Sequence, residues 1–147
     1  MCLLIRSNEL KAEKDIVCYK VVGYQKLLDN YYTPFAAKRI HRECITEGMH
    51  FIAEGNKTVH CGVYGYTVSE GKIHTLKKEN DACHLAFLLK DNLHSGILLK
   101  VFKCVIPEGT MYYEGRDEST DDQAYASDKI IFKEEINWEN VTYVPKS

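Results

Sequence analysis

The sequence lacks the features that mark several common classes of protein. It has no run approaching the roughly 20 apolar residues of a membrane-spanning helix, and the apolar segment Met1 to Ile5 is too short for the core of a signal peptide. A strong excess of one sign of charge is lacking too, because 19 basic and 21 acidic residues leave a formal net charge of −2. We therefore expect a cytoplasmic protein with no membrane and no nucleic-acid partner, since affinity for phosphates normally needs a basic surface.

Metal-binding and phosphate-binding patterns are also missing. Six cysteines and six histidines occur without any Cys-x-x-Cys or His-x-x-x-His spacing, and two of them, His60 and Cys61, are adjacent. Adjacent residues of a strand point to opposite faces, so this pair would not share one ion. The pair Gly71 and Lys72 has neither the preceding glycine nor the following Ser or Thr of a phosphate loop. We predict no bound metal and no cofactor on these grounds.

The six cysteines are expected to be free thiols. The chain shows no secretion signal, and disulfides are rare in the reducing compartments where such a chain would stay. Cys18 and Cys104 lie inside apolar strand patterns. We interpret both as small core residues.

What the sequence does contain is the pattern of a strand-rich domain. A chain of 147 residues, 45% of them apolar, predicts one domain over residues 1–147. Residues 97–136 predict a buried strand, a turn at residues 107–109, a short aromatic strand and a return strand after Tyr125. A further strand is predicted at residues 15–23, which are rich in β-branched and aromatic residues and end at a glycine.

One main helix is predicted over residues 77–92, with Thr75 as a plausible N-cap. Four apolar residues recur there at i, i+3, i+4 and i+7, namely Ala82, Leu85, Ala86 and Leu89. Residues 25–50 could be helix or strand, residues 1–14 read as a lead-in, and residues 137–147 as an edge strand or tail held by Trp138. The prediction is an α+β fold with a mixed, mainly antiparallel sheet of about six strands.

Several segments resemble a family of short uncharacterised proteins of gut bacteria and their phages. These segments are DIVCYKVV near the start, YTPF, GKIHTL with Asp81 and Ala82 beyond it, and KCVIPEGTMYYEG followed by YASDKIIFKEEI. The resemblance is best toward the C-terminal end. It implies a phage or mobile-element context and no particular activity.

The order of motifs also resembles the layout of the ADP-ribosyltransferase fold, which implies NAD as a cofactor. In that resemblance Lys20 lies near the arginine or histidine of the first motif, and His74 and Thr75 lie near the middle one. The third motif should bring a catalytic glutamate before IIF, where this sequence has Ala-Ser-Asp ending at Asp128. An aspartate reaches about 1.5 Å less far, a displacement that can cost orders of magnitude in rate. The resemblance thus implies the fold without the glutamate.

The function expected from the sequence is a small accessory or binding protein without enzymatic activity. Its partner would be another protein, contacted through the Tyr-rich strands and the acidic loop at residues 114–128. The alternatives are an NAD-binding protein of the ADP-ribosyltransferase type and a structural subunit or homo-oligomer, with the oligomeric state left open. The residues predicted for a ligand site are Tyr19, His74 and Tyr125, where His74 either helps to cap the helix or holds an anion at its N-terminus.

Overall fold

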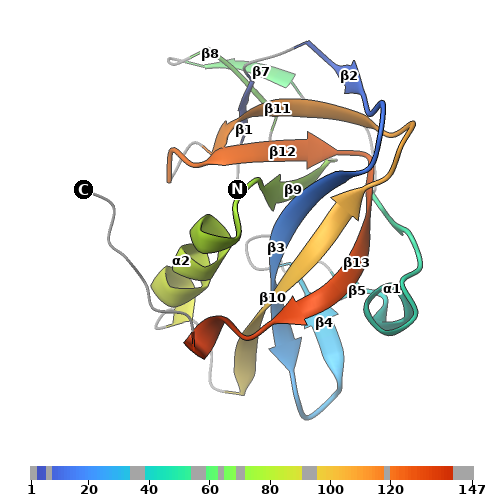
Figure 1. Ribbon diagram of the computed structural model, residues 1–147. Coiled ribbons are helices and arrows are strands. Elements are labelled where there is room, and N and C mark those ends of the chain that lie inside the picture. The colour runs from blue at the N-terminus through green and yellow to red at the C-terminus, as the bar shows by residue number, and fades with distance from the viewer. Residues whose placement is uncertain are drawn as a thin grey trace.

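The computed structural model describes residues 3–5, 8–33, 39–53, 59–62, 65–68, 72–90, 96–117 and 120–140. For residues 59–62, 65–68 and 140 it describes the backbone alone. Thirteen strands, two α-helices and a 3-10 turn lie within these ranges, and every strand pair among them is antiparallel (Figure 1). The predicted α+β class with a mainly antiparallel sheet is confirmed, whereas the expected number of about six strands is wrong.

The strands form two groups. The first group contains β6 (Phe51–Ile52), β13 (Lys129–Ile136), β10 (Ile97–Ile106), β3 (Ile16–Gln25), β4 (Asn30–Tyr32) and β5 (Arg39–Ile40), in that spatial order. The second contains β9 (Ile73–Leu76), β12 (Gln123–Ser127), β11 (Met111–Asp117), β1 (Leu3–Ile5), β8 (Gly65–Val68) and β7 (Val59–Gly62), with β2 (Leu10–Lys11) also on β11. A single registered pair, Tyr19 opposite Leu76, joins them. The two groups of strands therefore separate from each other beyond this one registered pair.

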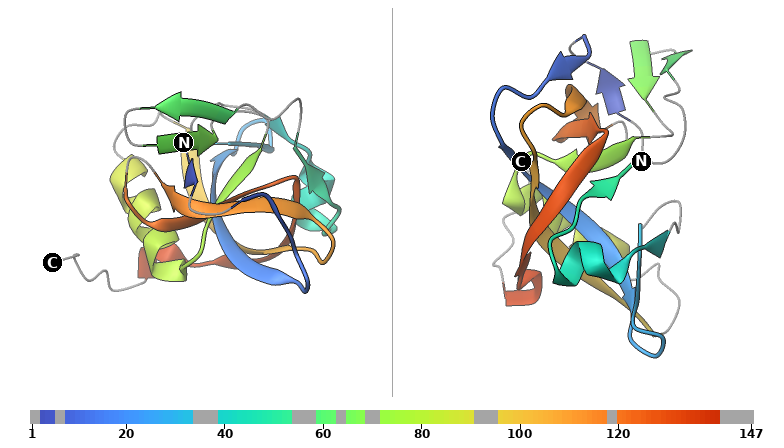
Figure 2. Two further views of the ribbon diagram at one scale, coloured as in Figure 1. Left: turned by 90° about the horizontal axis from the view of Figure 1, so that it is seen from above. Right: turned by 90° about the vertical axis from the view of Figure 1, so that its right-hand side faces the viewer.

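The centre of the first group is the β3–β10 pair, with ten consecutive residue pairs from Ile97 opposite Gln25 to Ile106 opposite Ile16. Both segments are rich in β-branched and aromatic residues, which favour strands. Helix α2 (Glu79–Leu89) packs on one side of this pair and α1 (Arg42–Thr46) lies on the other, as Figures 1 and 2 show. Side chains alternate between the two sides, so the strands separate two apolar clusters.

The main helix confirms the prediction in its centre and corrects it at its start. Helix α2 begins at Glu79 after an extended Lys78, which makes no side-chain capping bond. Thr75, the predicted N-cap, instead lies within β9. Among the described residues, no helix has the length and apolar character needed to cross a bilayer.

The less regular segments contain more structure than their patterns indicate. Residues 25–50 include two short strands and α1, so both readings of that region hold in part. Within the expected lead-in, β1 pairs with both β11 and β8. At the other end, where an edge strand or tail is expected over residues 137–147, residues 138–140 form a 3-10 turn (η2, Trp138–Asn140), and residues 141–147 lie outside the described residues.

Candidate functional site

The first polar feature is the seam where β3 and β9 separate. Lys20 lies on β3 directly after the joining residue Tyr19, and its Nζ donates a hydrogen bond to the main-chain oxygen of His74 at 2.9 Å. The lysine is only 6% exposed. The donor and the acceptor of this bond come from different groups of strands. Lys20 thus ties the two groups of strands together.

Two thiols lie near this lysine, and a hydroxyl lies near one of them. Cys18 and Cys104 are fully buried, and the hydroxyl of Thr75 is near the Cys18 thiol. Burial lowers the pKa of Lys20 from 10.5 to about 8, although the nearby thiols oppose that effect. Burial also raises the pKa of Cys18 to about 12, and it raises the pKa of Cys104 as well. Lys20, Cys18, Cys104 and Thr75 are all buried, and we call them the buried polar seam.

The three residues predicted for a ligand site do not all share one side of the strands. Tyr19 packs against the apolar cluster that includes α2, whereas Tyr125 belongs to the cluster on the opposite side. His74 lies directly opposite Ala126, which belongs to the α2-side cluster. Its side chain therefore points to the α2 side of the strands. His74 is also five residues before the first residue of α2, so it is not positioned to cap that helix.

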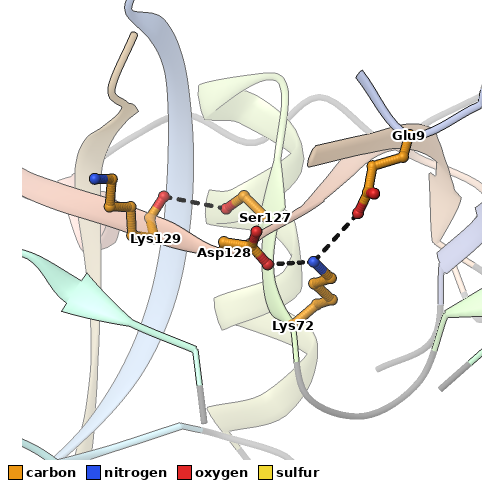
Figure 3. A network of polar contacts seen from close by, with 5 residues as sticks. All are labelled: Glu9, Lys72, Ser127, Asp128 and Lys129. Carbon is orange, nitrogen blue, oxygen red and sulfur yellow. Dashed lines mark hydrogen bonds and ion pairs between the residues drawn. The ribbon is translucent and has the colours of Figure 1, made fainter. Parts of the chain in front are cut away.

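Asp128, which takes the place of the catalytic glutamate in the ADP-ribosyltransferase resemblance, is engaged in an ion pair. Its carboxylate contacts the ammonium of Lys72, whose side chain is 5% exposed (Figure 3). A second carboxylate, that of Glu9, is 3.6 Å from the same ammonium. At the same turn the hydroxyl of Ser127 donates to the carbonyl of Lys129. This network joins the turn between β12 and β13 to the start of β9 and to the N-terminal segment.

The acidic and Tyr-rich region expected to make contacts is partly internal. Tyr113 and Tyr125 are buried, and so are the carboxylate residues Asp117 and Asp122. The hydroxyl of Thr120 donates a hydrogen bond to the Asp117 carboxylate at 2.9 Å. This bond lies within the connection between β11 and β12. Much of this region therefore contributes to the core and to its own turn.

The most exposed of the large apolar residues that the structure describes lies at the β3–β4 turn, residues Lys26 to Asp29, here called the hairpin tip. Leu27 is 91% exposed and Leu28 is 60% exposed. Leu98 is also exposed at this end of the sheet, where it lies opposite Tyr24. Figure 1 and the right-hand view of Figure 2 place the tip at the extreme end of the molecule.

The hairpin tip is held in one conformation by contacts to Asp29. The Tyr24 hydroxyl donates to the Asp29 carboxylate at 2.7 Å, and that bond raises the pKa of the Tyr24 hydroxyl. The guanidinium of Arg42 is 3.0 Å from the other carboxylate oxygen. Asp29 itself has a φ of 52°, a left-handed conformation that aspartate tolerates better than most residues. The leucines are thus presented on a fixed turn.

The turn itself does not require leucine. Gly, Asn, Asp, Ser and Pro dominate tight turns because they suit the backbone there, and a leucine gains no burial at such a place. This exposed turn was not predicted from the sequence, although the run Lys-Leu-Leu-Asp at residues 26–29 carries the signal. Two adjacent leucines between charged residues, in a segment without a helix or strand period, indicate exposed apolar side chains.

No group of three or more His, Cys, Asp or Glu side chains suited to a metal ion occurs in the described part of the chain. Comparison of the chain with models of protein families, with curated proteins and with solved structures gives no match. The class of the protein therefore rests on its own architecture, an antiparallel α+β fold with a buried polar seam and an exposed apolar hairpin tip.

Proposed function

We propose that this protein is a small binding protein whose hairpin tip inserts into an apolar pocket of another protein. The observation that carries the proposal is the 91% exposure of Leu27 on a turn fixed by Asp29. Binding by a preformed turn avoids most of the entropy cost of ordering a loop. An apolar side chain displayed in this way gains free energy only when a partner covers it.

A concave partner suits the tip better than a flat one. Stable protein interfaces bury roughly 800 Å² on each side, well beyond what two leucine side chains can supply on their own. A pocket, by contrast, encloses a projecting turn on several sides and also covers flanking residues such as Lys26 and Leu98. Complete burial of Leu27 and Leu28 would contribute about 3 kcal/mol, scaled by their present exposure.

The test compares variants in capture of a partner from lysate of the host cell. The tagged protein, the double variant Leu27→Ser/Leu28→Ser and the control Leu88→Ser would be treated identically. Leu88 is a suitable control because it is also exposed, at 48%, but lies on α2. We expect one protein to be retained by the first and the last and lost by the double variant. Direct titration of that partner should show about 100-fold weaker binding by the double variant.

A partner retained equally by all three proteins would refute the role of the tip. The alternatives have their own signatures in the same preparations. A dimer of the wild-type chain in light scattering that the double variant lacks would favour self-association. A rise of the melting temperature with NAD would favour the NAD-binding alternative.

A further inference from the structure

Two cysteines face each other across the central strand pair. Cys18 on β3 and Cys104 on β10 are directly opposite in the antiparallel register. Both are completely buried in the same apolar cluster, so their side chains share one side of the strands. Both are free thiols in this structure.

The register by itself brings the two residues within reach of a covalent bond. Directly opposite residues of an antiparallel pair have Cα atoms about 4.5 or 5.5 Å apart, depending on the type of pair. Disulfides span Cα separations of about 4.4–6.8 Å. The other cysteines with described side chains, Cys44 and Cys83, lie on α1 and α2 and are not in this register. Cys83 belongs to the opposite cluster.

The third member of this group is the ammonium of Lys20, two residues beyond Cys18 on the same strand. Its charge acts on both thiols, lowering the pKa of Cys18 and of Cys104 against the larger effect of burial. No ion pair joins Lys20 to a carboxylate among the described residues, whereas its hydrogen bond to His74 holds it in place. Burial nevertheless keeps both pKa values raised, so little of the reactive thiolate is present while the two strands are paired.

We propose that Cys18 and Cys104 form a reversible disulfide that links β3 to β10. A small disulfide such as oxidised glutathione serves as the oxidant. One cysteine thiolate attacks a sulfur of that reagent, whose S–S bond breaks to release one glutathione thiol and leave a mixed disulfide. The second cysteine attacks the protein sulfur of the mixed disulfide and expels the second glutathione. The protein loses two protons and two electrons, and the reagent is reduced to two thiols.

Burial determines when this exchange takes place. Neither sulfur meets solvent, so the oxidant reaches them only while β3 and β10 are apart, during folding or local opening. The bond closes a loop of about 86 residues, and loops of that length give large stabilisation because the unfolded chain loses freedom. We expect a melting temperature about 10 °C higher for the bridged form, from the usual response of a chain of this length.

The test is refolding of the full chain in a glutathione buffer, with free thiols then blocked by iodoacetamide. Peptide mapping by mass spectrometry should find Cys18 joined to Cys104 with the loss of two hydrogens. The variant Cys44→Ser/Cys83→Ser should form the same bond and show the same rise in melting temperature, and dithiothreitol should reverse both. Cys104→Ala should show neither.

Three results would overturn the proposal. In the first, Cys18 and Cys104 of the refolded wild-type protein both react with iodoacetamide once the chain is unfolded, which shows that they had remained free thiols. In the second, the mapped bond joins other cysteines. A bridged form that melts below the reduced one would equally contradict a bond that fits the native register. The wild-type map decides the matter even if the Cys104→Ala variant does not fold.

Discussion

Replacement of Lys20 by methionine tests the account of the buried seam. Methionine keeps most of the length of lysine but carries no charge and donates no hydrogen bond. The folded pKa of about 8 and the ordinary value of 10.5 differ by an amount worth about 3 kcal/mol. That free energy is the cost of burying the charge, and the loss of the bond to His74 works in the opposite direction by about 1–3 kcal/mol. Because the two effects oppose each other, the unfolding free energy of Lys20→Met at one pH tests little. The change of that free energy with pH is the decisive measurement.

The direction of that change follows from which state holds the proton. Between pH 10.5 and about 8 the unfolded chain binds a proton at Lys20 that the folded chain does not. Lowering the pH through this window therefore favours unfolding, with the full cost present below pH 8 and none above pH 10.5. Relative to Lys20→Met, the wild-type protein should gain about 1 kcal/mol of unfolding free energy from pH 7 to pH 9.

Urea unfolding of both proteins at pH 7 and pH 9 provides the measurement. Other groups that titrate in this range are present in both proteins, so they cancel in the difference. The control is Lys103→Met, which removes a partly exposed lysine from β10 and so accounts for the loss of one positive charge. An unfolding free-energy difference for Lys20→Met that is the same at both pH values would refute a desolvated ammonium at the seam.

Two further substitutions test the packing of the strands and of the C-terminal turn. A Cβ added at Gly115 would lie 1.9 Å from the carbonyl oxygen of Leu4, so Gly115→Ala should lower the unfolding free energy in urea by about 3 kcal/mol. The control Gly23→Ala, whose Cβ meets no atom closer than 3.5 Å, should leave the unfolding free energy nearly unchanged. Equal effects of the two substitutions would contradict this packing. Trp138→Phe removes the hydrogen bond from Nε1 to the carbonyl oxygen of Leu99 at 2.9 Å. It should lower the unfolding free energy by about 1–2 kcal/mol, and no change in the urea midpoint would show that the bond contributes nothing.

The ADP-ribosyltransferase resemblance illustrates how far a linear order of motifs reaches. The order of motifs did not predict that Lys20 would donate a hydrogen bond to the His74 carbonyl. It could not show that these groups are buried, nor that Asp128 is already paired with Lys72. Burial and pairing depend on what the other strands cover, and that information is not local.

The longest elements were predictable because their side-chain patterns are local. Strands β3 and β10 are largely apolar runs rich in β-branched residues, and the centre of α2 repeats apolar residues at the helical period. Strands of two to four residues, such as β1 and β5, are too short for any period to appear. Their hydrogen bonds come from partners far along the chain, so only the folded arrangement reveals them.

The amino-acid order alone therefore determined the class of fold, the two central strands, the main helix and the small buried cysteines, because each depends on neighbours a few residues apart. Tertiary structure alone decided which side chains share a side of the strands. It divided Tyr19 from Tyr125, set Cys18 opposite Cys104 and left Leu27 without cover. Register and the divergence of two groups of strands control these outcomes, and both arise from contacts between distant segments.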